Sequence, residues 1–151
     1  MFDTAGLTAI VVARQEGERI SLVGFLLDTY CLGAKNALPA ITLAGPDVSP
    51  FIDEFFGAYS RPPMPAPISL IEELVHGSVA YARGLGFEPH PDYYSAAAHL
   101  GPWQPPGRIT FGWEGRPHFV QGPSDNPDRV RRTLDRSVGP GNYGFLMVAD
   151  I

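Results

Sequence analysis

The sequence predicts an α+β fold: one domain, residues 1–151, with a mixed or mainly antiparallel sheet of about five strands and three to four helices. Two observations carry this prediction. An apolar hairpin stands near the N-terminus, and apolar residues recur at helical spacing in two later segments, 68–83 and 126–138. The length and the 44% hydrophobic content are typical of one domain with its own core, so we expect no internal boundary.

The first elements form the hairpin. Leu7–Ala13 is an apolar strand, Gln15–Glu18 is a turn that contains glycine, and Ile20–Leu27 is the returning strand. Both arms are almost continuously apolar, which predicts that both faces of the sheet are covered. The segment Asp28–Ala37 is expected to be irregular, and Leu38–Ala44 is either a short strand or more loop.

Helices are expected in the middle of the chain. Pro50–Tyr59 is a short helix with Ser49 as its N-cap. A proline-rich connector follows, and then Ile68–Arg83 gives the strongest helical pattern, with apolar residues three and four apart. Pro91–Leu100 is a further short helix with a proline at its start.

The C-terminal third predicts a second hairpin, 109–113 with 118–121, around Glu114 and Gly115. A helix begins at Asn126-Pro127 and ends before Gly139, and Tyr143–Ala149 is a closing buried strand. We expect the first hairpin and this last strand at the centre of one sheet, with the helix from Ile68 packed across one face.

Composition excludes several classes. Cys31 is the single cysteine, so there is no internal disulfide and no cysteine-based zinc cluster. No apolar run approaches bilayer length and the N-terminus lacks a basic, apolar leader, which favours a cytoplasmic protein with no membrane contact. The net charge of −5 disfavours general nucleic-acid binding.

Two polar segments form the candidate catalytic site. Asp28, Cys31 and Lys35 lie where the second strand gives way to loop, a frequent position for functional side chains. His90 and Asp92 are held between prolines at a helix start. If the two segments share a cleft, they suit acid–base or nucleophilic chemistry. The alternative is structural: Asp28 caps a turn, Cys31 is a buried apolar residue, Lys35 is solvated and His90 is a cap.

Metal ligation stays open. Asp92 with the three histidines 76, 90 and 99 offers mixed nitrogen and oxygen donors, but at no standard spacing. Glu72 and Glu73 with the aspartates 28 and 92 are a weaker two-metal alternative, because adjacent glutamates on a helix diverge.

Partner contacts are predicted at two places. The first is an aromatic patch, because Phe55 and Phe56 cannot both face one core; its residues are Phe51, Phe55, Phe56 and Tyr59. The second is a helix face with Arg129, Arg132 and Arg136, which suits phosphate or nucleic acid. Pairing with acidic neighbours, such as Asp128 with Arg132, is the favoured interpretation of that face.

Four sequence blocks resemble those of an uncharacterised, largely actinobacterial family of hypothetical bacterial proteins: DTYCLGAKNA, YARGLGFEPHPDYYSAAAHLG, ITFGWEGRPHFVQGPSDNPDRV and RSVGPGNYGFL. The resemblance covers nearly the whole chain and implies no particular activity. In some relatives an N-terminal stretch precedes the domain, which implies that a partner supplies what that stretch provides.

Two functional hypotheses follow. The first is a small cytoplasmic enzyme, a hydrolase on a phosphate-bearing or nucleic-acid substrate, that uses the five polar residues. The second is a non-catalytic binding or accessory module that docks on a larger protein through the aromatic patch.

Overall fold

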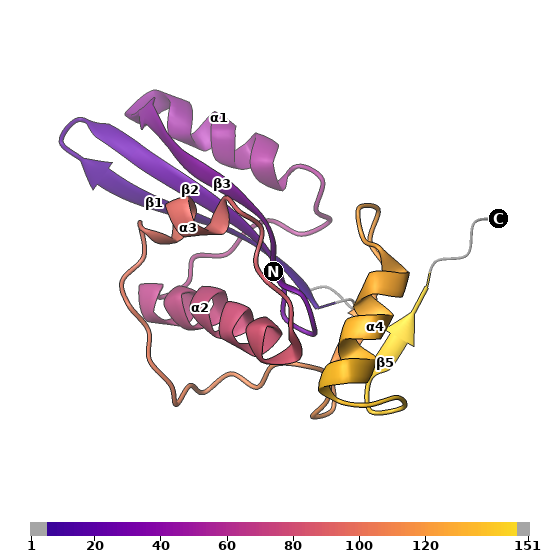
Figure 1. The fold of residues 1–151 in the computed structure, drawn as a ribbon. Helices are drawn as coiled ribbons and strands as arrows, with labels where there is room; N and C mark the ends of the chain where they lie inside the picture. Colours follow the sequence, from indigo (N-terminus) through magenta and orange to yellow (C-terminus); the bar gives the residue numbers. More distant parts are fainter. Residues whose placement is uncertain (1–5, 148–151) are drawn as a thin grey trace.

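The computed structural model describes residues 6–147 and confirms the α+β class (Figure 1). Within that range the strands form two sheets, where one was expected. Three antiparallel strands make the first sheet, in the order β1-β2-β3, and β4 pairs with β5 in parallel. The strands are β1 Leu7–Glu16, β2 Arg19–Asp28, β3 Gly33–Ala44, β4 His118–Val120 and β5 Gly144–Leu146.

The hairpin prediction is confirmed. Strands β1 and β2 pair in continuous register from Leu7 with Asp28 to Glu16 with Arg19, and Gly17 takes the positive φ that the turn requires. The prediction that the chain is irregular to Ala37 is wrong, because β3 begins at Gly33. Pairing with β2 satisfies the backbone groups on one edge of this polar segment.

The expected second hairpin is not formed. Residues 113 and 116 make only an isolated bridge, and β4 pairs with β5 instead. The prediction of a central closing strand is also wrong: β5 spans Gly144–Leu146, lies outside the three-stranded sheet and leaves Leu146 exposed. The last residues of the expected strand, from 148, lie outside the described residues.

The four helices within the described residues are α1 Gly45–Phe56, α2 Ile68–Leu85, α3 Tyr93–Ala97 and α4 Pro127–Ser137. The predictions of α2 and α4 are confirmed, and the Asn126 side chain caps α4 by accepting from the Arg129 N–H. Helix α1 begins five residues before the expected Pro50, since Pro46 occupies the first turn. Helix α3 is shorter than predicted, because residues 91 and 92 form a turn.

Helices lie over both faces of the three-stranded sheet, α1 over one and α2 with α3 over the other, as Figure 1 shows. Side chains of β2 alternate between the faces. Val23, Phe25 and Leu27 pack with α2 and α3 in the main core. Gly24, on the opposite face, lies against Phe55 of α1, close enough that a Cβ there would be 3.1 Å from the ring.

A second core joins the C-terminal elements to the rest of the chain. Cys31 and Leu85 meet Phe119 of β4 and Leu134 of α4 in one buried cluster. This cluster fixes α4 beyond one end of the three-stranded sheet (Figure 1). Within residues 6–147 no helix combines the length and the apolar character needed to cross a bilayer.

Candidate functional site

The two polar segments of the predicted catalytic site are neighbours. The His90 N–H donates to the Ala34 carbonyl at 2.9 Å, which joins the corner before α3 to the first residues of β3. The corner that carries His90 therefore lies beside the edge strand β3, at the residue before Lys35. What the five side chains can do depends on the partners they already have.

Asp28 caps the turn after β2. Its Oδ1 accepts the N–H groups of Tyr30 and Cys31 at 2.9 and 3.1 Å, and its Oδ2 accepts that of Leu32 at 3.1 Å. The residue is 4% exposed. Burial raises the pKa of this carboxyl to about 6, against the lowering effect of the three amides and Lys35. Every oxygen of the carboxylate is thus engaged in holding the turn.

Cys31 and Lys35 are also engaged within the protein. Burial raises the pKa of the Cys31 thiol far above its usual range, so the residue stays a protonated thiol at neutral pH. The Lys35 ammonium donates to Oδ2 of Asp125 at 2.8 Å, and the same oxygen accepts the Gly122 N–H. Lys35 therefore links β3 to the loop before α4.

His90 and Asp92 interact with each other in the turn before α3, and the Asp92 side chain makes no helix-cap hydrogen bond. The Asp92 N–H donates to Nδ1 of His90 at 3.1 Å, and the Asp92 carboxylate lies 3.8 Å from the same nitrogen. His76 contacts Tyr93 and Gly101, while His99 contacts Ser21, so the histidines are dispersed. No group of three His, Cys, Asp or Glu side chains in residues 6–147 is placed to hold a metal ion.

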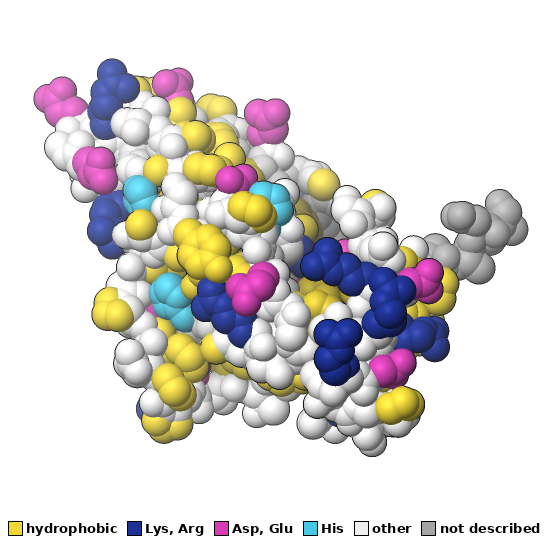
Figure 2. Space-filling view, in the orientation of Figure 1, with side chains coloured by type: hydrophobic (Ala, Val, Ile, Leu, Met, Phe, Trp, Pro, Cys, Tyr) yellow, Lys and Arg dark blue, Asp and Glu magenta, His cyan; other side chains and the backbone are white. Residues whose placement is uncertain are grey.

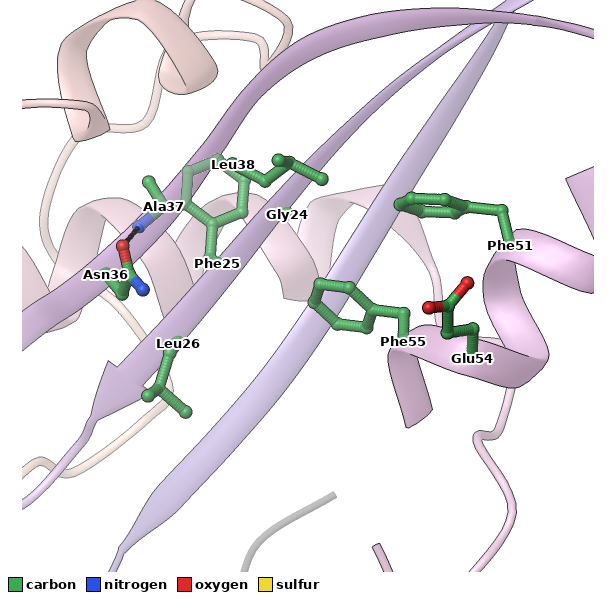
Figure 3. A pocket seen from close by; sticks show the side chains of 9 residues that line it. All are labelled: Gly24, Phe25, Leu26, Asn36, Ala37, Leu38, Phe51, Glu54 and Phe55. Atoms are coloured by element: carbon green, nitrogen blue, oxygen red, sulfur yellow. Dashed lines mark hydrogen bonds between the residues drawn. The ribbon is translucent and has the colours of Figure 1, made fainter. Parts of the chain in front are cut away.

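A groove of about 440 Å³ opens between α1 and the outer face of β2 and β3 (Figure 3). Figure 3 shows the rings of Phe51 and Phe55 pointing from α1 toward the strands. Its floor and walls are mostly apolar. The lining residues are Gly24, Phe25, Leu26, Asn36, Ala37, Leu38, Phe51, Glu54 and Phe55.

Helix α1 covers the sheet incompletely. None of its side chains is buried, although its aromatic residues turn toward the strands. Phe51, Phe55, Phe56 and Tyr59 form a row in which neighbouring ring centroids are 5.0–6.1 Å apart. The predicted aromatic patch is therefore half-exposed, and two of its members, Phe51 and Phe55, line the groove.

The sequence indicated the aromatic residues that α1 contributes to the groove, but not the residues that β2 and β3 contribute. Leu26 and Leu38 lie in apolar runs that read as core. Gly24 pairs with Leu38 across β2 and β3, and this pairing places them under the helix. The strand residues of the groove could be identified only from the pairing of β2 with β3, whose register shifts between Leu22 and Gly24.

The charged side chains of α1 are all acidic. Helix α1 carries Asp47, Asp53 and Glu54 and contains neither lysine nor arginine. Glu54 lines the groove itself. The groove therefore combines an apolar surface with a single carboxylate at its side.

The arginine face of α4 is exposed. Figure 2 shows lysine and arginine side chains gathered over this helix. The expected ion pair between Asp128 and Arg132 is not formed, and Arg129 and Arg136 have no acidic partner within the part of the chain described. This face is basic in a protein whose net charge is −5.

Comparison of the chain with protein-family models, curated proteins and solved structures gave no significant match in any of the three.

Proposed function

We propose that this chain is a non-catalytic, cytoplasmic binding module whose α1 groove receives an apolar segment of a partner protein. One observation carries the proposal: α1 lies over the sheet without burying any of its side chains, and the space beneath it is an open apolar groove. An exposed apolar surface of this kind marks interaction sites in many proteins.

Burial provides the driving force for such binding. Phe51 and Phe55 are half-buried in the free chain, and a partner side chain in the groove would cover them together with Leu38. Completing the burial of one aromatic or aliphatic side chain stabilises a complex by about 1.5–3 kcal/mol. A few such contacts suffice for specific binding, because a small number of buried anchors dominates most interfaces.

Charge defines the partner more closely. The Glu54 carboxylate lies at the side of the groove, with Asp47 and Asp53 on the same helix. An occupant with a lysine or arginine beside its apolar anchors would pair with Glu54, whereas an acidic occupant would be repelled. The proposed partner segment is therefore apolar and basic.

Peptide display tests this proposal. Short random peptides are selected on the wild-type chain, and the affinity of the recovered peptides is measured for variants. Apolar peptides that carry a lysine or arginine are expected, with affinity lowered about tenfold by Phe55→Ala and less by Glu54→Gln. Trp113→Ala, which removes an exposed aromatic outside the groove, is the matched control.

Failure to recover peptides that depend on Phe55 would overturn the proposal. Sedimentation of the free chain tests whether a second copy of the chain, and not a different protein, occupies the groove. A dimer that Phe55→Glu converts to a monomer would place a second copy of the chain in the groove instead of a different protein.

The hydrolase hypothesis is the second candidate. The pKa of Asp28, raised to about 6, is in the range that suits general acid–base catalysis. Against it, none of the five candidate residues lines the α1 groove or the smaller pocket between α2 and α3. Phosphate release from p-nitrophenyl phosphate is the test. Release by the wild-type chain that is abolished in a folded Asp28→Asn variant would favour the enzyme over the binding module.

A further inference from the structure

A second pocket, of about 340 Å³, lies between α2, α3 and the loop that follows α3. It is separate from the α1 groove and shares no residue with it. Its volume is at the low end of the range for small-molecule sites. The lining residues are His76, Val79, Ala80, Arg83, Tyr93, Pro102, Trp103 and Pro105.

The aromatic wall of this pocket is held in place. The benzo edge of Trp103 lies against two glycines: a Cβ at Gly107 would be 2.9 Å from Cζ2, and one at Gly77 would be 3.8 Å from Cη2. The loop itself is tied to α2, because Oε1 of the buried Glu73 accepts the N–H groups of Arg108 and Ile109. The indole therefore offers a flat, preorganised surface.

His76 already has a hydrogen-bond partner at each ring nitrogen. Its Nε2 lies 3.0 Å from the Gly101 carbonyl, which can only accept, so Nε2 carries the proton. In the neutral ring Nδ1 then accepts the O–H of Tyr93 at 3.0 Å. Both nitrogens are satisfied without a ligand.

Arg83 is the pocket's permanent cation. Its guanidinium donates to the Tyr94 O–H oxygen at 2.8 Å and lies 3.4 Å from Oε2 of Glu88. Arg83 and Glu88 are 43% and 74% exposed, so this pair is weak and open to competition from another anion. Guanidinium groups bind carboxylates with directed, charge-assisted hydrogen bonds.

We propose that this pocket binds a small aromatic carboxylate, with its ring against Trp103 and its carboxylate on Arg83. The site is independent of the proposed partner groove and goes beyond that function. A flat ring matches the tryptophan and proline walls, and an anion matches the guanidinium of Arg83, the one arginine among the lining residues.

The test is NMR titration with phenylacetate and with its neutral analogue phenylacetamide. The chain has two tryptophans, hence two indole N–H signals, and Trp103→Phe identifies the one in the pocket. Phenylacetate is expected to shift the Trp103 signal and to bind about tenfold more tightly than the amide. Arg83→Gln should remove that difference, while Arg136→Gln, in the last turn of α4, should leave it unchanged.

Glu88→Gln should change the affinity for phenylacetate in the opposite direction to Arg83→Gln. Removing the competing carboxylate should raise the affinity for phenylacetate and leave that for the amide unchanged, in a variant that keeps every residue of the pocket. The tripeptide Gly-Gly-Phe carries the same ring and carboxylate on a peptide. Tighter binding of the tripeptide than of phenylacetate would overturn the small-molecule assignment.

Two other results would overturn the proposal. One is a Trp103 signal that neither probe moves. The other is equal affinity of the wild-type chain for the acid and the amide, since the charge on Arg83 would then play no part.

Discussion

The Lys35 ammonium on β3 lies 2.8 Å from Oδ2 of Asp125, a residue 90 positions later in the chain. The two side chains are only 15% and 9% exposed, and the pair ties the three-stranded sheet to the loop that precedes α4. It is the longest-range side-chain ion pair in residues 6–147.

Lys35→Met should lower the free energy of unfolding by about 2–3 kcal/mol, because it leaves a largely buried carboxylate without its cation. Urea denaturation at neutral pH measures the change. Glu88→Gln, which breaks the exposed pair with Arg83, is the control and should cost less than about 1 kcal/mol. Equal losses in the two variants would show that burial adds nothing to the Lys35 pair.

Asp28 should make stability depend on pH between about 4 and 6. Burial raises the pKa of its carboxyl from 3.8 to about 6, so the folded state holds the proton more tightly than the unfolded state. The stabilisation from the protonated Asp28 carboxyl is then fully present below pH 4 and is lost as pH rises through 6. The free energy of unfolding should fall by about 3 kcal/mol over this range.

Asp28→Asn removes this titration. The variant should be clearly less stable than the wild type at pH 4, because its amide nitrogen cannot accept a turn N–H, and the gap should narrow by pH 7. Urea denaturation at both pH values gives the comparison. A gap that is the same at the two pH values would contradict the raised pKa.

Glu73 should hold the loop after α3. Its carboxylate accepts the Arg108 and Ile109 N–H groups, so Glu73→Ala leaves two amides without their acceptor and should cost about 1–3 kcal/mol. Hydrogen exchange of the Ile109 amide should accelerate in this variant. Glu72→Ala, at the adjacent and less buried position, should leave that amide protected.

Gly24 should keep the α1 groove open. A Cβ there would lie 3.1 Å from Phe55 and 3.2 Å from Leu38, so Gly24→Val fills the groove and displaces the ring. Affinity for a selected peptide should fall about tenfold while the strand is preserved, since valine favours strands. Gly84→Ala, whose Cβ would meet nothing within 4 Å, is the control. Unchanged affinity in Gly24→Val would place the peptide elsewhere.

The helices and strands that were predicted correctly are those whose sequence signal lies within the element itself. The hairpin β1–β2 follows from two apolar runs around a glycine turn, and α2 and α4 follow from periodicity and caps. The first part of β3 was missed because the polar segment after Asp28, with its glycine, is typical of a loop, whereas a strand over Leu38–Ala44 was one of the two alternatives left open. Pro39 lies on an edge strand where the register shifts, between Leu38 and Ile41, a position at which a proline is tolerated, so tertiary pairing outweighed the local preference.

The α1 groove and the pocket at Arg83 could not be predicted in full, because each is built from residues that lie far apart in the sequence. Phe51 and Phe55 were predicted as part of an interaction surface because the adjacent Phe55 and Phe56 cannot both face one core. The groove also needs Gly24 and Leu38, which the pairing of β2 with β3 places beneath the helix. The pocket at Arg83 was not predicted, since its walls come from three separate segments. The ion pair of Lys35 was missed for the same reason, and its lysine was assigned to chemistry instead.

The most direct test of the binding function is the NMR footprint of a peptide selected on the wild-type chain. We expect the largest backbone shifts at Gly24, Leu38 and Phe55, on the two sides of the α1 groove. Shifts confined to α4 or to the pocket around Arg83, with the α1 signals unmoved, would contradict it.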